Sequence, residues 1–128
     1  MVVASILIVE DERLVAMDLQ RRLARLGYTV VSLAASGMEA IQKALALHPD
    51  VVLMDVRLQG DMDGVEAAEQ IHTSAAIPVV FMTAYVDADT QHRVGAASPW
   101  SCLRKPFSPR QVQSALEHVL SGHPPETP

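Results

Sequence analysis

The sequence predicts an α/β fold in which helices cover both faces of a parallel sheet. Short apolar runs alternate five times with longer amphipathic runs, which is the pattern of repeated βα units. The first run, over 5–10, lacks alternating polar residues, as expected of a central strand covered on both faces. With 128 residues and 49% hydrophobic content, the chain is long enough for one domain with a substantial core.

The first helix and the second strand have clear signals. A helix over 12–26 has apolar residues on one stripe, and Gly27 is placed to end it. The stripe consists of Val15, Leu19, Leu23 and Leu26. The next strand, over 29–33, is more polar than the first, which indicates an edge of the sheet.

A second helix and a buried strand occupy the middle of the chain. Ser36 is the expected N-cap, and Glu39 three residues later completes a capping box. The helix ends before Pro49, because proline cannot continue it. Its expected buried face consists of Ala40, Ile41, Ala44 and Leu45. The apolar strand over 51–54 is followed by a loop and a third helix over 63–73.

The last third of the chain is expected to hold two strands and two helices. A strand over 78–82 precedes a helix over 87–95, whose weakly apolar face predicts the least stable helix of the fold. The fifth strand is short, near 102–103. The last helix has Ser108 as its N-cap and Pro109 at its first position. Its expected inward residues are Val112, Ala115, Leu116 and Val119.

Composition excludes several classes of function. The formal net charge of −5 and the pI near 5.4 remove the attraction that non-specific binding to nucleic acid or acidic membranes needs. The longest apolar stretches have the length of strands and the N-terminus lacks the features of a signal peptide, so we expect a cytoplasmic protein. The one cysteine and five histidines lack the spacing of a zinc site.

Three acidic residues, a threonine and a lysine follow the apolar strands at the points where the strands end. Because the carboxyl ends of parallel strands meet at one edge of a sheet, we expect these side chains to lie together. They are Glu10, Asp11, Asp55, Thr83 and Lys105. Neighbouring carboxylates repel one another, and a hard divalent cation such as Mg²⁺ relieves that repulsion.

This combination predicts phosphoryl transfer to a carboxylate. Mg²⁺ bridges carboxylate and phosphate oxygens, while Lys105 adds positive charge and the Thr83 hydroxyl adds a hydrogen bond. Such transfer depends mostly on positioning and on neutralising charge on the equatorial oxygens. Asp55, which ends the apolar run 51–54, is therefore the candidate nucleophile and phosphoacceptor.

Four motifs at the strand ends together resemble a known family. Following the first, third, fourth and fifth strands, they are Glu10-Asp11, Asp55, Thr83-Ala84 and Lys105-Pro106-Phe107. In this order they resemble the receiver domain of two-component response regulators, over roughly residues 5–120. The resemblance implies a flavodoxin-like, three-layer (βα)5 fold with a parallel five-stranded sheet of order 2-1-3-4-5. We expect a receiver domain over 1–121 and a proline-rich tail or linker start over 122–128.

The resemblance also implies a function, that of a phosphorylation-dependent signalling switch. The phosphoryl group would come from a sensor histidine kinase or a phosphotransfer protein. The surface of the fourth helix, fifth strand and fifth helix would then change to bind an unidentified downstream protein. That surface is also a candidate for contact between two copies of the chain. Such a protein catalyses its own phosphoryl transfer and loss but is a regulator, not a turnover enzyme.

The resemblance assigns roles around the metal. Asp11 and Asp55 would ligate Mg²⁺ together with the backbone carbonyl of Arg57, while Glu10 would act mainly through a coordinated water. Arg57 and Tyr85 flank the site, and we expect them to modulate the loss of the phosphoryl group by shielding it from water or admitting water to it.

The resemblance also assigns roles around the phosphoryl group. Thr83 and Lys105 would contact its oxygens, and Ala84 would leave room for it. The bond between Lys105 and Pro106 would be cis. Three positions before the lysine, where the family usually has an aromatic residue that swings inward, this chain has Cys102.

A thiol cannot act as the aromatic lever of the family. We expect Cys102 to be a small buried strand residue. The output would then be read through Trp100 or Tyr85, or more through the helix over 87–95 itself.

Alternative interpretations of the same residues are limited by missing motifs. Taken alone, Glu10-Asp11-Glu12 would be a helix start favoured by the helix dipole, and Asp55 would be a cap. A phosphatase of the haloacid dehalogenase type needs an acid two residues after its nucleophile, where Arg57 stands. The phosphate loops of flavodoxins and P-loop enzymes are missing. The remaining alternative is a receiver-like module that binds partners without phosphorylation switching.

Overall fold

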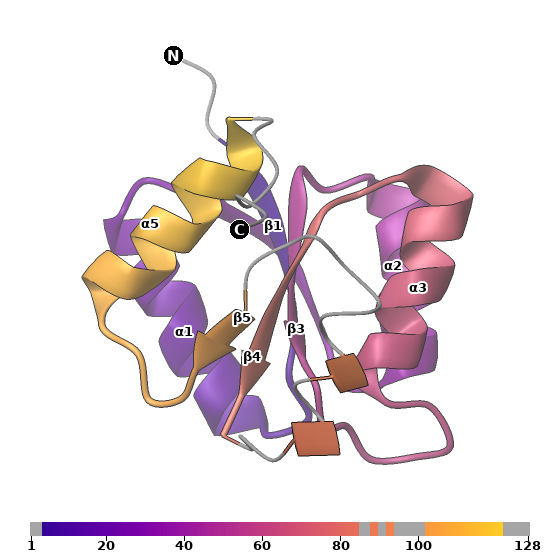
Figure 1. The fold of residues 1–128 in the computed structure, drawn as a ribbon. Coiled ribbons are helices and arrows are strands. Elements are labelled where there is room, and N and C mark those ends of the chain that lie inside the picture. Colours follow the sequence, from indigo (N-terminus) through magenta and orange to yellow (C-terminus); the bar gives the residue numbers. More distant parts are fainter. Residues whose placement is uncertain (1–3, 85–87, 90–91, 94–101, 122–128) are drawn as a thin grey trace.

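A parallel five-stranded sheet forms the centre of the fold (Figure 1). The computed structural model describes residues 4–84, 88–89, 92–93 and 102–121. The strand order is β2-β1-β3-β4-β5, and every neighbouring pair is parallel, which confirms the predicted fold class. The strands are β1 (Ser5–Val9), β2 (Thr29–Ala34), β3 (Val51–Asp55), β4 (Val79–Thr83) and β5 (Cys102–Arg104). The helices are α1 (Arg13–Arg25), α2 (Gly37–Leu47), α3 (Gly64–Ala75) and α5 (Pro109–Leu120).

Helices cover both faces of the sheet. Figure 1 shows α1 and α5 on one face and α2 and α3 on the other. Successive residues of β1 alternate between the faces, because side chains of a strand point to opposite sides. Leu7 and Val9 join the apolar cluster beneath α2 and α3, whereas Ile6 and Ile8 join the cluster beneath α1 and α5. Burial on both faces explains why the strand is apolar throughout.

The strands β3 and β4 are buried along their whole length. Full burial of one large apolar side chain, such as Phe81 or Leu53, stabilises the fold by about 1.5–3 kcal/mol. Many such contacts hold each strand in one position. The carboxyl ends of these strands are therefore rigid supports for the side chains that follow them.

Side-chain caps fix the starts of the helices. Ser36 accepts the N–H of Glu39 at 3.1 Å, as predicted. The Glu39 carboxylate, however, accepts the N–H of Ala35 at 2.6 Å, so the second half of the predicted capping box is wrong. The box is complete at α5, where Ser108 and Gln111 accept one another's N–H groups at 3.1 and 2.8 Å. A cap of this kind contributes about 1 kcal/mol.

Two apolar residues that were predicted to be buried are exposed at the surface. Val15 on α1 is 40% exposed and Leu45 on α2 is 39% exposed. In α1 the buried stripe is rotated by one position, so that Ala16 takes the place of Val15. In α2 the small residues Ala40 and Ala44 face the sheet, which lets the helix approach closely and leaves the longer side chain outside.

The segment from the predicted fourth helix to β5 differs from expectation at one described residue, Cys102 in β5. The predicted helix over 87–95 falls largely outside the described residues, although residues 88–89 and 92–93 are helical. Cys102 is exposed, so its predicted burial is wrong. The reason is that β5 is a short edge strand whose middle residue, Leu103, faces the core while its neighbours face outward.

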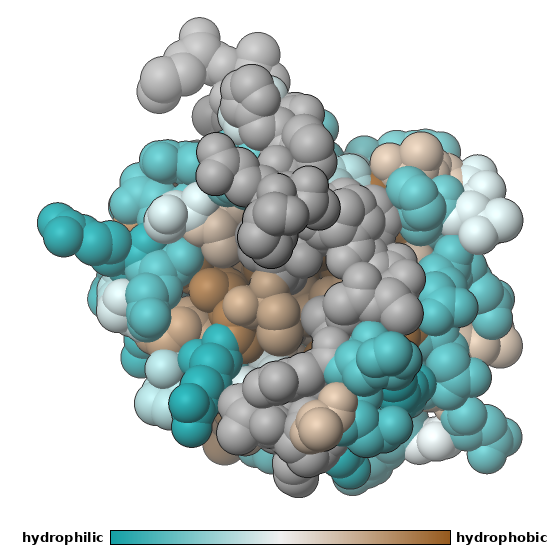
Figure 2. Space-filling model, in the orientation of Figure 1, coloured by the Kyte–Doolittle hydropathy of each residue, from teal (hydrophilic) through white to brown (hydrophobic). Residues whose placement is uncertain are grey.

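The described helices present polar outer faces. Figure 2 shows hydrophilic side chains over the helices on either side of the molecule. Besides Val15 and Leu45, the exceptions are Leu14 on α1 and Met38 and Leu47 on α2, with 82%, 57% and 47% of their surfaces exposed. None of the described helices has both the length and the apolar character needed to cross a membrane.

Gly64, the first residue of α3, lies directly against the end of β3. A Cβ atom at this position would collide with the carbonyl oxygen of Asp55 and lie 2.9 Å from its carbonyl carbon. The N–H of Gly64 donates to the carbonyl oxygen of Val56 at 2.9 Å. Glycine is needed here because only a residue without a side chain allows this approach.

We predict that Gly64→Ala lowers the free energy of unfolding by about 1–3 kcal/mol, because the added methyl group must displace backbone. Gly37→Ala is the matched control. There the Cβ would lie 3.0 Å from the Met62 side chain and 3.2 Å from the Met62 carbonyl oxygen, which a small shift relieves, so the loss should be smaller. Urea denaturation of both variants measures the difference. Equal stability of Gly64→Ala and wild type would contradict the proposed close contact.

Candidate functional site

The carboxyl ends of four strands bring the predicted site residues together. Glu10 follows β1, and its N–H donates to the carbonyl oxygen of Ala34 at 2.9 Å. Asp55 and Thr83 are the last residues of β3 and β4. Lys105 follows β5, and its N–H donates to the carbonyl oxygen of Thr83 at 2.8 Å. Backbone hydrogen bonds of the sheet thus set the position of each side chain.

Glu10, Asp11 and Asp55 form an acidic cluster. One carboxylate oxygen of each residue lies within 4.8 Å of the others. Glu10 and Asp55 are buried, with 4% and 6% of their surface exposed, while Asp11 is more accessible. Magnesium prefers carboxylate and carbonyl oxygens and retains several waters. An oxygen-only cluster that is open to solvent on one side fits that preference.

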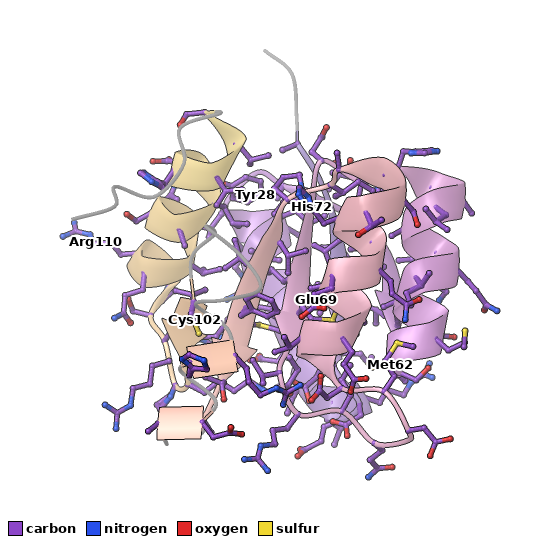
Figure 3. The ribbon with its side chains drawn as sticks, turned by 45° about the vertical axis from the view of Figure 1, so that its right-hand side comes forward. Tyr28, Met62, Glu69, His72, Cys102 and Arg110 are labelled. Carbon is purple, nitrogen blue, oxygen red and sulfur yellow. The ribbon has the colours of Figure 1, made fainter. Side chains whose placement is uncertain are left out.

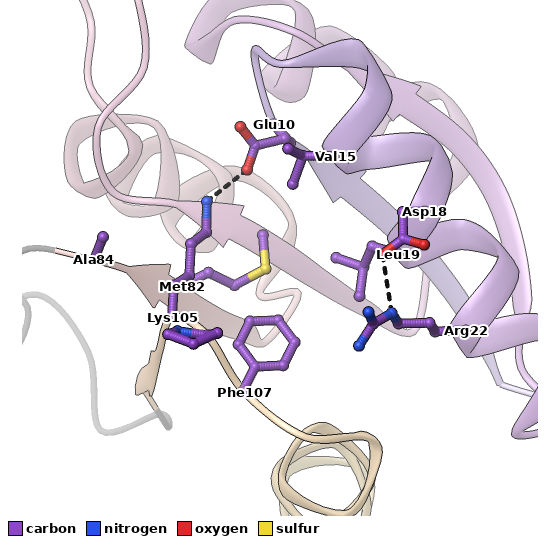
Figure 4. Close-up of a pocket in the computed structure, with 10 residues that line it drawn as sticks. Glu10, Val15, Asp18, Leu19, Arg22, Met82, Ala84, Lys105 and Phe107 are labelled. Carbon is purple, nitrogen blue, oxygen red and sulfur yellow. Dashed lines mark hydrogen bonds and ion pairs between the residues drawn. The ribbon is translucent and has the colours of Figure 1, made fainter.

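Lys105 lies between the two buried carboxylates. Its Nζ donates to Glu10 Oε2 at 2.6 Å, the contact drawn in Figure 4, and to Asp55 Oδ2 at 2.9 Å. Burial lowers the pKa of Lys105, but the hydrogen bonds and charges of both carboxylates outweigh burial, so the pKa is raised above its ordinary value. The ammonium group is therefore protonated at neutral pH, and both hydrogen bonds are charge-assisted.

The other oxygens of the two buried carboxylates accept backbone N–H groups. Asp55 Oδ1 accepts the N–H of Arg57 at 3.1 Å, and Glu10 Oε1 accepts the N–H of Glu12 at 3.2 Å. In each carboxylate, one oxygen therefore accepts a hydrogen bond from the backbone of the following loop, and the other accepts one from Lys105. Arg57 lies beside the cluster, while the use of its carbonyl oxygen as a metal ligand stays a prediction.

An open cavity of about 480 Å³ lies over the cluster. Its lining consists of Glu10, Asp11, Glu12, Val15, Asp55, Arg57, Leu58, Gln59, Ala84 and Lys105. A more apolar groove of about 370 Å³ adjoins it and extends to Leu19 and Phe107 (Figure 4). The groove shares Glu10, Val15, Ala84 and Lys105 with the cavity. Both hollows are open to solvent, and Asp55 lines the cavity of about 480 Å³.

Of the residues with predicted roles around the phosphoryl group, Ala84 and Lys105 line this cavity. Thr83 is buried at the end of β4, and the neighbouring Ala84 is exposed and lines the cavity. The bond between Lys105 and Pro106 is cis, as the resemblance implied. The structure thus brings Thr83 and Lys105 to the same sheet edge as Asp55.

The residues predicted to read the switch are only partly described. Tyr85 and Trp100 lie outside the described residues. Figure 3 shows Cys102 on β5, beside α5, from which Arg110 extends outward. Although Cys102 is exposed, partial burial raises the pKa of its thiol. A protonated thiol is a poor nucleophile, which argues against a redox role for this residue.

Two contacts near Asp55 could not be recognised in the sequence. The first is the approach of Gly64 to the Asp55 carbonyl group. The second is an ion pair of 2.6 Å between Asp63 Oδ2 and a guanidinium nitrogen of Arg93. The spacing of Asp63 and Glu66 indicates a helix cap, but no local pattern indicates a partner so distant in the chain.

The sequence is similar to those of known proteins. Residues 6–117 match the response regulator receiver domain. The chain is 38% identical over 116 residues to the transcriptional regulatory protein PdtaR of Mycobacterium tuberculosis and 33% identical over 118 residues to the phyllosphere-induced regulator PhyR of Methylorubrum extorquens. Both alignments cover 91% of this chain but 56% and 43% of the relatives. The chain therefore spans about half the length of these curated relatives.

A solved structure supports the same assignment. The signal receiver domain of a modulated diguanylate cyclase from Desulfovibrio desulfuricans G20 is 34% identical and has a TM-score of 0.89, with 94% of this chain and 96% of that chain covered. Receiver domains of response regulators are regulatory switches and not turnover enzymes. The match over 6–117 shows that this chain belongs to the receiver domain family of two-component response regulators.

Proposed function

We propose that the chain is a phosphorylation-dependent switch whose phosphoacceptor is Asp55. The observation that carries this proposal is the contact of Lys105 with Asp55 and Glu10, at 2.9 and 2.6 Å, beside an acidic cluster. That lysine puts a positive charge within reach of phosphoryl oxygens attached to Asp55. The proposed donor is the phosphohistidine of a sensor histidine kinase or a phosphotransfer protein.

The proposed cofactor is Mg²⁺. Its ligands would be Asp11, Asp55 and the backbone carbonyl of Arg57, with Glu10 acting through a coordinated water. The oxygen chemistry of the cluster and its 4.8 Å spacing support this choice. Bound there, Mg²⁺ supplies positive charge that offsets the carboxylates and the phosphoryl oxygens.

The transfer exchanges one bond to phosphorus for another. A carboxylate oxygen of Asp55 forms an O–P bond while the P–N bond of the donor breaks, and the histidine nitrogen keeps the electron pair of that bond. Lys105 already donates to Asp55, so a small movement brings its ammonium group to the phosphoryl oxygens. The Thr83 hydroxyl adds a hydrogen bond, and Ala84 has no large side chain to obstruct it.

Phosphorylation would shift the protein between two conformations. Contacts of Thr83 and Lys105 with the phosphoryl group exist only in the modified protein, and this difference drives the shift. The proposed output surface comprises the segment over 87–95, β5 and α5, and it would bind a downstream protein or a second copy. Arg57 and Tyr85 would modulate the loss of the phosphoryl group.

The domain bounds, the location and the class of partner are inferred from the same family assignment. We infer a receiver domain over 1–121, a tail or linker start over 122–128, and a cytoplasmic location. The net charge of −5 supports protein partners over direct contact with nucleic acid or membranes.

Incubation with Mg²⁺ and acetyl phosphate should add one phosphoryl group, detected by intact-protein mass spectrometry. Asp55→Asn removes the nucleophile and should abolish labelling, and chelation by EDTA should prevent it. Asp61→Asn is the matched control, because Asp61 is exposed in the same loop and lies outside the cluster. It should be labelled like the wild type.

Two results would contradict this expectation. Labelling that persists in Asp55→Asn excludes Asp55 as the acceptor. Absence of labelling in the wild type, together with no response to beryllofluoride, favours the alternative of a receiver-like module that binds partners without phosphorylation switching.

Lys105→Met should lower the free energy of unfolding by about 1.5–3 kcal/mol in EDTA, because it leaves two buried carboxylates without a cation. Adding Asp55→Asn to that variant should restore part of the loss by removing one negative charge. Arg22→Gln is the control, since it breaks an exposed pair with Asp18 of 2.9 Å and should cost less than about 1 kcal/mol. Equal losses in urea denaturation for Lys105→Met and Arg22→Gln would disprove the special role of the lysine.

A further inference from the structure

Asp63 makes two different contacts at the start of α3. Its Oδ1 accepts a hydrogen bond from the N–H of Glu66 at 3.0 Å and so caps the helix. Its Oδ2 forms an ion pair of 2.6 Å with the guanidinium group of Arg93. The Glu66 carboxylate in turn accepts the N–H of Asp63 at 3.4 Å. The cap holds the Asp63 carboxylate in one orientation, with its second oxygen directed to Arg93.

The same turn of α3 touches the backbone of Asp55. Gly64, which follows Asp63, packs against the Asp55 carbonyl group so closely that a Cβ atom would not fit. A Cβ there would also lie 3.0 Å from the side chain of Met54. Closely packed groups transmit displacement. A movement of the Asp55 backbone therefore has to move the start of α3.

Arg93 connects this turn to the chain between β4 and β5, where residues 92–93 are helical. The hydrogen bond to Asp63 is the largest cause that raises the pKa of Arg93, and the charges of Asp89 and Glu66 raise it further. The side chains of Arg93 and Asp63 are 37% and 25% exposed, so water screens the pair in part.

We propose that the Asp63–Arg93 ion pair restrains residues 92–93 in the unmodified protein and is weakened when Asp55 is phosphorylated. This inference rests on the proposed function of Asp55. The contacts run from the Asp55 carbonyl group through Gly64 and Asp63 to Arg93, and none of them involves Cys102. They offer a route to the output surface in a chain that lacks the usual aromatic switch.

Thermodynamic linkage makes this proposal quantitative. If the ion pair stabilises the unmodified conformation more than the modified one, it shifts the equilibrium between them by a definite factor. Removing the pair must shift that equilibrium toward the modified conformation by the same factor. For a partly exposed ion pair that factor is roughly two- to fivefold. The affinity for beryllofluoride, which mimics a phosphoryl group on Asp55, should rise by that factor when the pair is removed.

The experiment measures beryllofluoride affinity in the presence of Mg²⁺ by titration calorimetry on the full chain. Asparagine caps helices as well as aspartate does, so Asp63→Asn removes the charge and keeps the cap. We expect Asp63→Asn and Arg93→Gln each to bind roughly two- to fivefold more tightly, and the double variant to bind no more tightly than either. Arg93→Lys, which keeps the charge, should stay closer to wild type. Arg22→Gln is the control for loss of an unrelated ion pair and should leave the affinity unchanged.

Hydrogen exchange of the peptide covering residues 88–93 gives a second readout. In the wild type, beryllofluoride should speed exchange there. In Asp63→Asn and Arg93→Gln, exchange should already be fast without beryllofluoride and should respond less to its addition.

The outcomes separate this inference from the proposed function. A wild type that binds no beryllofluoride overturns the proposed function. A wild type that binds normally, combined with unchanged or weakened affinity in Arg93→Gln or with additive effects in the double variant, overturns the inference alone. If Asp63→Asn does not fold, the affinity and exchange of Arg93→Gln decide the question.

Discussion

Two carboxylates at the buried ends of β1 and β3 share one lysine, and the geometry of the site depends on that shared charge. Glu10 and Asp55 are almost entirely buried, and unpaired buried charges are strongly unfavourable. Lys105 offsets both, but it can reach them only if β5 is paired with β4, because its backbone N–H donates to Thr83. The pairing of β5 with β4 therefore positions the cation that the two buried carboxylates need.

The same constraint explains where the chain is tightly packed. Large apolar side chains fill both faces of β1, β3 and β4, so Asp55 cannot withdraw from the cluster along its strand. On the other side of Asp55, Gly64 brings α3 into contact with its backbone, and the Asp63 cap holds that helix in place. The charged groups around Asp55 thus lie where the backbone is tightly packed and has little freedom to move. A change of charge on Asp55 would therefore act on its neighbours and would not be absorbed locally.

The sequence predicts the sheet and the membership of the site because both depend on local signals. Strand-length apolar runs reveal buried strands, and the positions of Asp55 and Lys105 follow from the ends of those runs. The face that a helix buries is less well determined, since Leu45 satisfies the helical period and still lies outside. Contacts between distant surface residues, such as Asp63 with Arg93, leave no periodic signal and become visible only in three dimensions.

Cys102 is an exposed thiol on the edge strand β5 and cannot act as an aromatic lever, so we expect other residues to transmit the output. The proposed switch first requires one site for the metal and the phosphoryl group at the carboxyl ends of the strands, whichever element transmits the output. Titration with Mg²⁺, followed by ¹H–¹⁵N NMR, tests that claim most directly. We expect saturable shifts confined to the surroundings of Asp11, Asp55 and Arg57, and their loss in Asp55→Asn. Shifts that do not saturate and that spread over exposed acids such as Asp61 would contradict it.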